Sequence, residues 1–204
     1  MKCVFLLAAA VLALAGRDVA LAADPRYPDW PCRQIKVPEL SVAAVWAGPP
    51  IDDVGNAWES DPQIKDLVSR LAARRISIEE AEKSVMDFLA ADPKEKQIRA
   101  RLVFAGVFAK LYHERSEVMN GIERFSQRQK EFAEQIRTKG RQIRDLQDES
   151  NHDAPKLDEL ANDIDWDRRI FEERRKTINY VCEVPVIIEQ RLGALARAIQ
   201  QSLE

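Results

Sequence analysis

FAGVFAKLYHERSEVMNGIERFSQRQKEFAEQIRTKGRQIRDL, residues 104–146, is the stretch that decides the fold. Within it, one set of positions recurs at spacings that alternate between four and three residues, which is typical of a coiled-coil seam. The seam positions are Phe104, Phe108, Leu111, Arg115, Val118, Ile122, Phe125, Gln129, Phe132, Ile136, Lys139, Ile143 and Leu146. We therefore expect one long helix that packs along a single face against another helix.

The C-terminal part of the chain carries a matching seam. Its positions are Leu157, Leu160, Ile164, Asp167, Phe171, Arg174, Ile178, Val181, Pro185, Ile188, Leu192, Leu195 and Ile199. A polar segment near residues 150–155 separates the two seams and predicts a turn. If the chain folds back there, Leu146 meets Leu157 at one end and Phe104 meets Ile199 at the other.

The fold class that follows is all-α. Residues 92–204 are predicted to form a long antiparallel coiled-coil helical hairpin, with its first helix opening at Asp92–Pro93. Residues 59–91 hold two short helices with capping signals, which form a small helical base. We expect this base to cover the half of the hairpin farthest from the turn, and the half nearest the turn to project as a bare arm.

Residues 23–58 form a proline- and tryptophan-rich segment, which we call the belt. Its proline spacing forbids a long helix and favours extended backbone. The stretch Leu40–Trp46 is a candidate short strand, although the sequence offers no second strand to pair with it. We expect an ordered extended segment that lies across the helices, with a disordered tail as the alternative.

Four polar residues interrupt the two seams. Gln129 and Arg174 fall in the same layer, and Lys139 and Asp167 fall in adjacent layers, where they can form a diagonal pair. A polar layer in an apolar seam lowers stability and fixes the register of the helices. We expect these residues to set the register, with binding of a partner or an ion as the alternative.

The N-terminus has the features of a signal peptide. Lys2 precedes an apolar run from Val4 to Ala15, and Ala20-Leu21-Ala22 is a small-residue cleavage site. The apolar run is shorter than the about 20 residues that a membrane helix needs. We expect residues 1–22 to be removed and the mature protein to be periplasmic or secreted, with no membrane span. An uncleaved anchor is the alternative.

Removal of residues 1–22 takes away Cys3 and leaves two cysteines, Cys32 and Cys182. In an oxidising compartment, each of these has one partner within the chain. We predict a Cys32–Cys182 disulfide. Two free thiols, or a bridge between two molecules, are the alternatives.

The sequence carries no recognisable catalytic motif. The formal net charge is −3 with both signs interleaved, so no basic surplus marks a nucleic-acid site. The two histidines, His113 and His152, have no partner at metal-ligand spacing, and phosphate-loop and nucleophile-elbow motifs are absent from the sequence. We expect no enzyme activity, no cofactor and no metal.

The function expected from these features is that of an exported, noncatalytic protein-interaction, scaffold or chaperone-like protein. Its coiled-coil arm would engage an unidentified protein partner in the periplasm, or a second copy of the chain in a homo-oligomer. The alternative is a ligand- or metal-binding helical bundle with a site in the base. The candidate residues for that site are Tyr112, His113, Arg115 and Tyr180.

Overall fold

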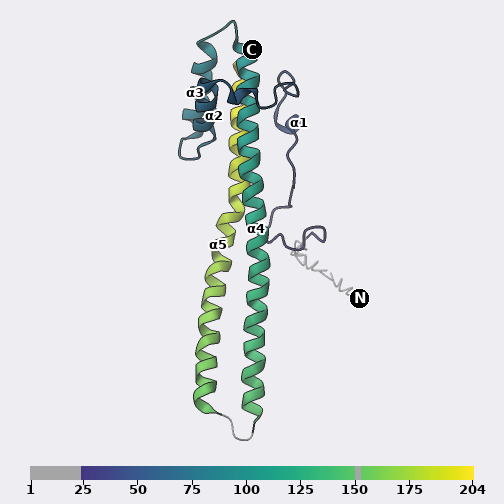
Figure 1. Cartoon of the computed structure of the whole chain (residues 1–204), viewed down its shortest axis with the longest axis vertical. Coiled ribbons are helices and arrows are strands. Elements are labelled where there is room, and N and C mark those ends of the chain that lie inside the picture. Colours follow the sequence, from purple (N-terminus) through teal and green to yellow (C-terminus); the bar gives the residue numbers. More distant parts are fainter. Residues whose placement is uncertain (1–23, 150–152) are drawn as a thin grey trace, which may run out of the picture.

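The structure, a computed structural model, describes residues 24–149 and 153–204 and contains a long helical hairpin (Figure 1). Helix α4 (Lys96–Asp148) and helix α5 (Ala154–Gln201) run antiparallel and pack against each other. The described residues form helices, turns and irregular segments and contain no strand. The prediction of an all-α hairpin is confirmed. The expected signal peptide, residues 1–22, lies outside the described residues.

The two helices pair in the register that their seams predict. The rings of Phe132 and Phe171 lie 6.5 Å apart, and Nζ of Lys139 lies 2.7 Å from Oδ2 of Asp167. We call residues 130–173, the part of the hairpin nearest the turn, the arm. Most seam side chains of the arm are half-buried, because the opposite helix is the main element that covers them.

Two short helices, α2 (Pro62–Ala72) and α3 (Ile78–Ala90), cover one side of the hairpin at the end away from the turn (Figure 1). Their apolar faces join α4 and α5 in one hydrophobic core. We call α2, α3 and the parts of α4 and α5 that they cover the base. The side chains that α2 and α3 bury there are Ile64, Leu67, Val68, Leu71, Ala81, Val85 and Leu89.

Capping side chains determine where the helices of the base begin. The carboxylate of Asp61 accepts two backbone N–H bonds in the first turn of α2, and the hydroxyl of Ser77 accepts one in α3. The third helix begins later than Asp92–Pro93, where the sequence predicts it. Helix α4 starts at Lys96, because the chain first makes a turn in which the Asp92 carboxylate accepts the N–H of Glu95 at 3.4 Å.

Most of the belt lies on the opposite side of the hairpin from α2 and α3 (Figure 1). It contains a one-turn helix, α1 (Val42–Val45), and a 3-10 helix, η1 (Ala57–Glu59). The candidate strand at Leu40–Trp46, for which the sequence offers no partner strand, is not formed. Since the described residues offer no strand to pair with, the backbone there closes a helical turn, in which the N–H of Trp46 donates to the carbonyl of Val42 at 2.9 Å.

Candidate functional site

A disulfide bond fastens the belt to α5. The bond joins Cys32 to Cys182 with a Cα–Cα distance of 5.5 Å, so the predicted disulfide is confirmed. Beside it, the side-chain amide of Gln34 donates to the carbonyl of Cys182. The indole N–H of Trp30 in turn donates to the carbonyl of Gln34 at 2.8 Å. Gln34 therefore ties the belt to α5 next to the covalent bond, and the bond from Trp30 closes a turn within the belt itself.

Arg115 fastens the belt at a second point. Its side chain occupies a seam position of α4 and is only 2% exposed. Nη2 donates to the carbonyl of Val37 at 2.5 Å, and Nη1 donates to the carbonyl of Pro38 at 3.3 Å. Nε donates to Oε1 of Glu189 on α5 at 2.5 Å. One buried guanidinium group therefore ties the belt, α4 and α5 together, and its donors are not directed at an open site.

The four residues predicted for a site in the base do not converge. The donors of Arg115 are used by the belt, whereas His113 is exposed and the side chain of Tyr180 is 74% exposed. The ring of Tyr112 is half-buried and stacks on Phe108, with centroids 5.7 Å apart. In the observed register Tyr180 lies level with residue 123, about 16 Å along the hairpin from Tyr112. These side chains therefore do not form one site.

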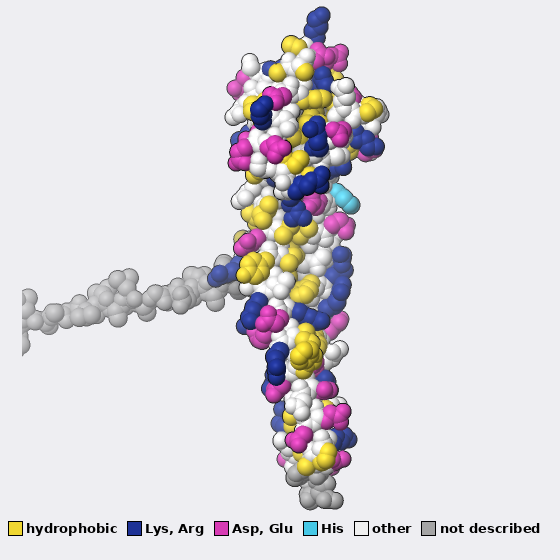
Figure 2. Space-filling view, turned by 90° about the vertical axis from the view of Figure 1, so that its left-hand side faces the viewer, with side chains coloured by type: hydrophobic (Ala, Val, Ile, Leu, Met, Phe, Trp, Pro, Cys, Tyr) yellow, Lys and Arg dark blue, Asp and Glu magenta, His cyan; other side chains and the backbone are white. Residues whose placement is uncertain are grey.

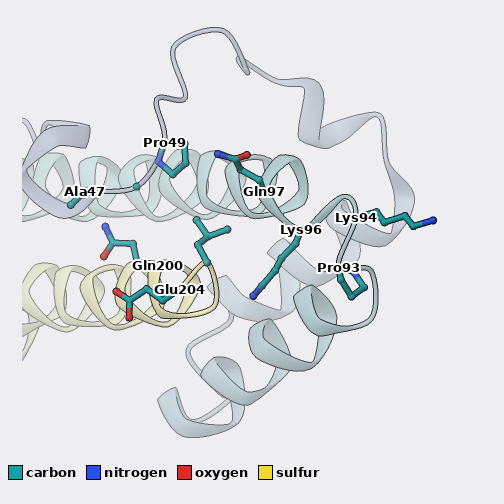
Figure 3. A pocket seen from close by; sticks show the side chains of 10 residues that line it. Ala47, Pro49, Pro93, Lys94, Lys96, Gln97, Gln200 and Glu204 are labelled. Carbon is teal, nitrogen blue, oxygen red and sulfur yellow. The ribbon is translucent and has the colours of Figure 1, made fainter.

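A cleft of about 740 Å³ opens at the far end of the base, where the belt, the α3–α4 turn and the C-terminus meet (Figure 3). The side chain of Lys94 extends away from Gln200 and Glu204 in this view. The cleft contains none of the four residues predicted for the base. Its lining residues are Ala47, Gly48, Pro49, Pro93, Lys94, Lys96, Gln97, Gln200, Leu203 and Glu204.

Across residues 24–149 and 153–204, no group of three His, Cys, Asp or Glu side chains is placed to hold a metal ion. None of the helices described is both long and apolar enough to cross a membrane.

Gln129 and Arg174 share a layer but do not bond to each other. The amide of Gln129 donates to the carbonyl of Phe171 at 3.4 Å, and the guanidinium of Arg174 lies over the ring of Phe132, 5.1 Å from its centroid. The long side chain of Arg174 reaches past the seam, so its charge stays near solvent. Among the described residues, Oε1 of Gln129 is buried without a hydrogen-bond donor.

Lys139 and Asp167 form the expected diagonal pair. The hydrogen bond to Asp167 is the main cause that raises the pKa of Lys139, and Asp163 adds to it with an oxygen 3.6 Å away. Both partners are partly exposed, so the pair adds little stability. Its role in setting the register stays a prediction.

One side of the hairpin stays open below the base. In each long helix, the residues one position before the seam form a row on the side where α2 and α3 pack. At the level of the base the row of α5 is covered, since Arg191 donates to the carbonyls of Leu71 at 2.6 Å and Ile76 at 2.8 Å. Figure 2 looks at the side that α2 and α3 occupy and shows hydrophobic side chains continuing down the hairpin below them, between charged ones.

Three large side chains of this row are exposed on α5. The exposed fractions are 46% for Ile187, 74% for Tyr180 and 62% for Trp166. The corresponding row of α4 at the same levels is polar and carries both positive and negative side chains. We call the two rows together the open flank; it consists of Trp166, Ile170, Glu173, Thr177, Tyr180, Val184 and Ile187 on α5 and of Glu117, Gly121, Arg124, Arg128, Glu131 and Gln135 on α4.

Sequence reasoning missed the open flank, although a signal was present. Ile170, Tyr180, Val184 and Ile187 each precede a seam residue by one position. An apolar row beside a seam widens the buried face of a helix and indicates that a third element packs there. Exposed apolar and aromatic side chains gathered on one face mark protein interaction sites.

Comparisons of the chain with protein-family models, with curated proteins and with solved structures found no match.

Proposed function

We propose that this chain is an exported, noncatalytic interaction protein that presents its coiled-coil hairpin to another protein. The observation that carries the proposal is the open flank, where Tyr180 and Trp166 are exposed on a helix whose neighbouring surface is already packed. Large aromatic side chains are the residues that most often anchor protein interfaces. The disulfide and Arg115 hold the hairpin and belt as one body, so a partner would meet a preorganised surface.

Export is supported by two features. The disulfide between Cys32 and Cys182 is typical of proteins in oxidising compartments, and residues 1–22 have the pattern of a secretory signal. We expect the mature protein to begin at Ala23 and to be recovered from the periplasm or the medium. Mass spectrometry of the intact protein after cell fractionation measures both; a full-length chain in the cytoplasmic fraction would contradict export.

The interaction is tested by photo-crosslinking in living cells. A benzophenone amino acid at position 180 replaces an exposed aromatic residue of the open flank, and the same amino acid at Asn179 is the matched control. Asn179 is an exposed neighbour on α5 that lies outside the open flank. We expect a specific crosslinked protein from position 180 and none from position 179. No crosslink from either position, or the same products from both, would refute the open flank as the working surface.

A further inference from the structure

The belt packs on the hairpin in two separate parts. The part from residue 42 to residue 58 belongs to the base, because Trp46 and Trp58 are buried in its hydrophobic core. The ring of Trp46 stacks on the ring of Phe104, with centroids 4.0 Å apart. Neither cysteine of the disulfide belongs to this core. This part of the belt is therefore held by the folded base and does not need the covalent bond.

The part from residue 24 to residue 38 lies against the middle of the hairpin (Figure 1). There Trp30 packs on Met119 and Ile122 of α4 in a second, smaller apolar cluster. Ordering a chain segment costs conformational entropy at every residue. Among these fifteen residues only Trp30 is buried, so the apolar area that they bury offsets little of this cost. The bond at Cys32 is therefore a main reason that the segment stays on the hairpin.

The other contacts of residues 24–38 are polar. The carboxylate of Asp29 accepts from Lys130 at 2.7 Å near the surface. Nζ of Lys36 lies 2.5 Å from Oε1 of Glu123. The carbonyls at the end of the segment accept from Arg115, which water would reach once the segment left. Polar groups that regain water in this way contribute little net stability, so these contacts do not replace the covalent bond.

The two cysteines differ in their exposure. Cys182 is buried on α5, whereas Cys32 in the belt is half-buried. Thiol–disulfide exchange needs an open path for the attacking thiolate, and exposed disulfides are the labile ones. Cys32 is therefore the side from which a reductant can approach the folded protein.

We propose that the Cys32–Cys182 disulfide is a redox-sensitive switch. A dithiol reductant opens the bond, residues 24–38 leave the hairpin, and an apolar surface around Met119 and Ile122 is uncovered while the base stays folded. This surface lies on the other side of the seam from the open flank, since Met119 and Cys182 each follow a seam position by one residue. The switch goes beyond the proposed function and does not depend on which protein the open flank binds.

The chemistry of the switch is thiol–disulfide exchange. A thiolate of the reductant attacks Sγ of Cys32, the bond between the two sulfurs breaks, and Cys182 leaves as a thiolate that takes a proton from water. The second thiolate of the reductant then attacks the mixed disulfide and releases Cys32, which takes a proton in turn. Two electrons pass to the chain, and the dithiol becomes a disulfide. A disulfide oxidant reverses both steps and returns the segment to the hairpin.

The two methionines of the mature chain provide the test. Met119 is 4% exposed beneath the belt, whereas Met86 on α3 is 45% exposed. Hydrogen peroxide converts accessible methionine to the sulfoxide, which peptide mass spectrometry measures at each position. In Cys32→Ser/Cys182→Ser we expect Met119 to react about tenfold faster than in the oxidised parent, because local opening exposes it. Met86 should react equally fast in both proteins and is the internal control.

Circular dichroism separates local release from a bond that holds the whole fold together. The parent chain, reduced with dithiothreitol after it has folded, should keep its far-UV signal, and trypsin should cut it faster after Arg33. Loss of the helical signal on reduction would overturn the switch, because the base would then depend on the bond. Continued protection of Met119 in the serine variant would overturn it as well, because the segment would stay in place without the bond.

The rate of reduction tests whether the folded protein is attacked directly. Under native conditions the rate should rise in proportion to the concentration of dithiothreitol, and oxidised glutathione should restore the resistance to trypsin. A rate that levels off would mean that the bond opens only when the protein unfolds, and resistance that does not return would mean that release is irreversible. Either result would overturn the switch. These measurements use no binding partner, so their failure would leave the proposed function intact.

Discussion

Replacing Arg115 by methionine tests whether a buried charge holds the belt on the hairpin. Methionine keeps most of the volume of the side chain and removes three hydrogen bonds, to the carbonyls of Val37 and Pro38 and to the carboxylate of Glu189. Breaking a fully buried ion pair by deleting one partner costs about 3–5 kcal/mol. Glu189 is 36% exposed and can regain water, so we expect a smaller loss of about 2–3 kcal/mol in the free energy of unfolding.

The assay is urea unfolding of the oxidised protein at 25 °C, followed by far-UV circular dichroism, with Arg128→Met as the control. Arg128 is exposed, so its replacement should change the free energy of unfolding by less than about 0.5 kcal/mol. Trypsin provides a local measurement, because the bond after Lys36 lies beside the carbonyls that Arg115 holds. We expect faster cleavage there in Arg115→Met. A variant as stable and as resistant to trypsin as the parent would refute the assigned role of Arg115.

Three further predictions concern the belt and the base. Replacing Cys32 and Cys182 by serine should lower the free energy of unfolding by about 5 kcal/mol, because the bond closes a loop of 150 residues. Chemical denaturation measures the loss, and a change below about 1 kcal/mol would contradict the prediction. Gly106→Ala should cost about 1–3 kcal/mol in thermal unfolding, since a Cβ there would lie 2.8 Å from the buried ring of Trp58; an unchanged melting temperature would show that the ring can move. The hydrogen bond from Lys130 lowers the pKa of Asp29 in the folded protein. The contact is therefore fully present above about pH 3.9, the pKa of Asp29 in the unfolded chain, and is lost as the pH falls through the lower pKa of the folded state. The hydrogen-exchange protection factors near Asp29, which are corrected for the intrinsic pH dependence of exchange, should therefore fall below about pH 4 in the parent and show no such fall in Asp29→Asn. Identical pH profiles would contradict the assignment.

The hairpin could be predicted from the sequence because its signal is periodic and long. Thirteen seam positions in each helix repeat the same spacing, and one register pairs all of them. Phe132 faces Phe171 and Lys139 reaches Asp167 as this register requires. Because the spacing repeats, a shift of one residue in the pairing would misplace every seam side chain of the hairpin. Such a pattern therefore determines both the fold and the pairing of the two helices.

The contacts of the belt and of Arg115 could not be predicted in the same way. A polar residue at a seam position indicates that something satisfies it, but the acceptors proved to be carbonyls of Val37 and Pro38, far earlier in the chain. Every residue has a backbone carbonyl, so the sequence does not indicate which carbonyls accept hydrogen bonds from a given side chain. For the same reason the turn of α1 escaped prediction, since Leu40–Trp46 has strand-like residues and its conformation depends on what packs beside it.

The residues predicted for a site in the base do not come together, for a different reason. The prediction of a site at Tyr112, His113 and Tyr180 rests on residue type, since these side chains are able to bind a ligand. Their positions relative to the seam already place Tyr180 on a different level and side of the hairpin from Tyr112. The open flank follows from the apolar residues that precede the seam positions along α5, and polar residue types alone do not reveal it.

The disulfide can form only late in the synthesis of the chain. Cys32 leaves the ribosome 150 residues ahead of Cys182, which at about 5–20 residues per second is a delay of roughly 8–30 s. During that interval Cys182 is not yet present, so an oxidant that took two electrons from Cys32 could join it only to another cysteine, such as Cys3 of the precursor. The correct bond forms only after α5 has been synthesised and has folded back along α4, because that register brings Cys182 to the belt. The oxidised Cys32–Cys182 pair therefore indicates that the chain has been synthesised past Cys182 and that α5 has folded back along α4.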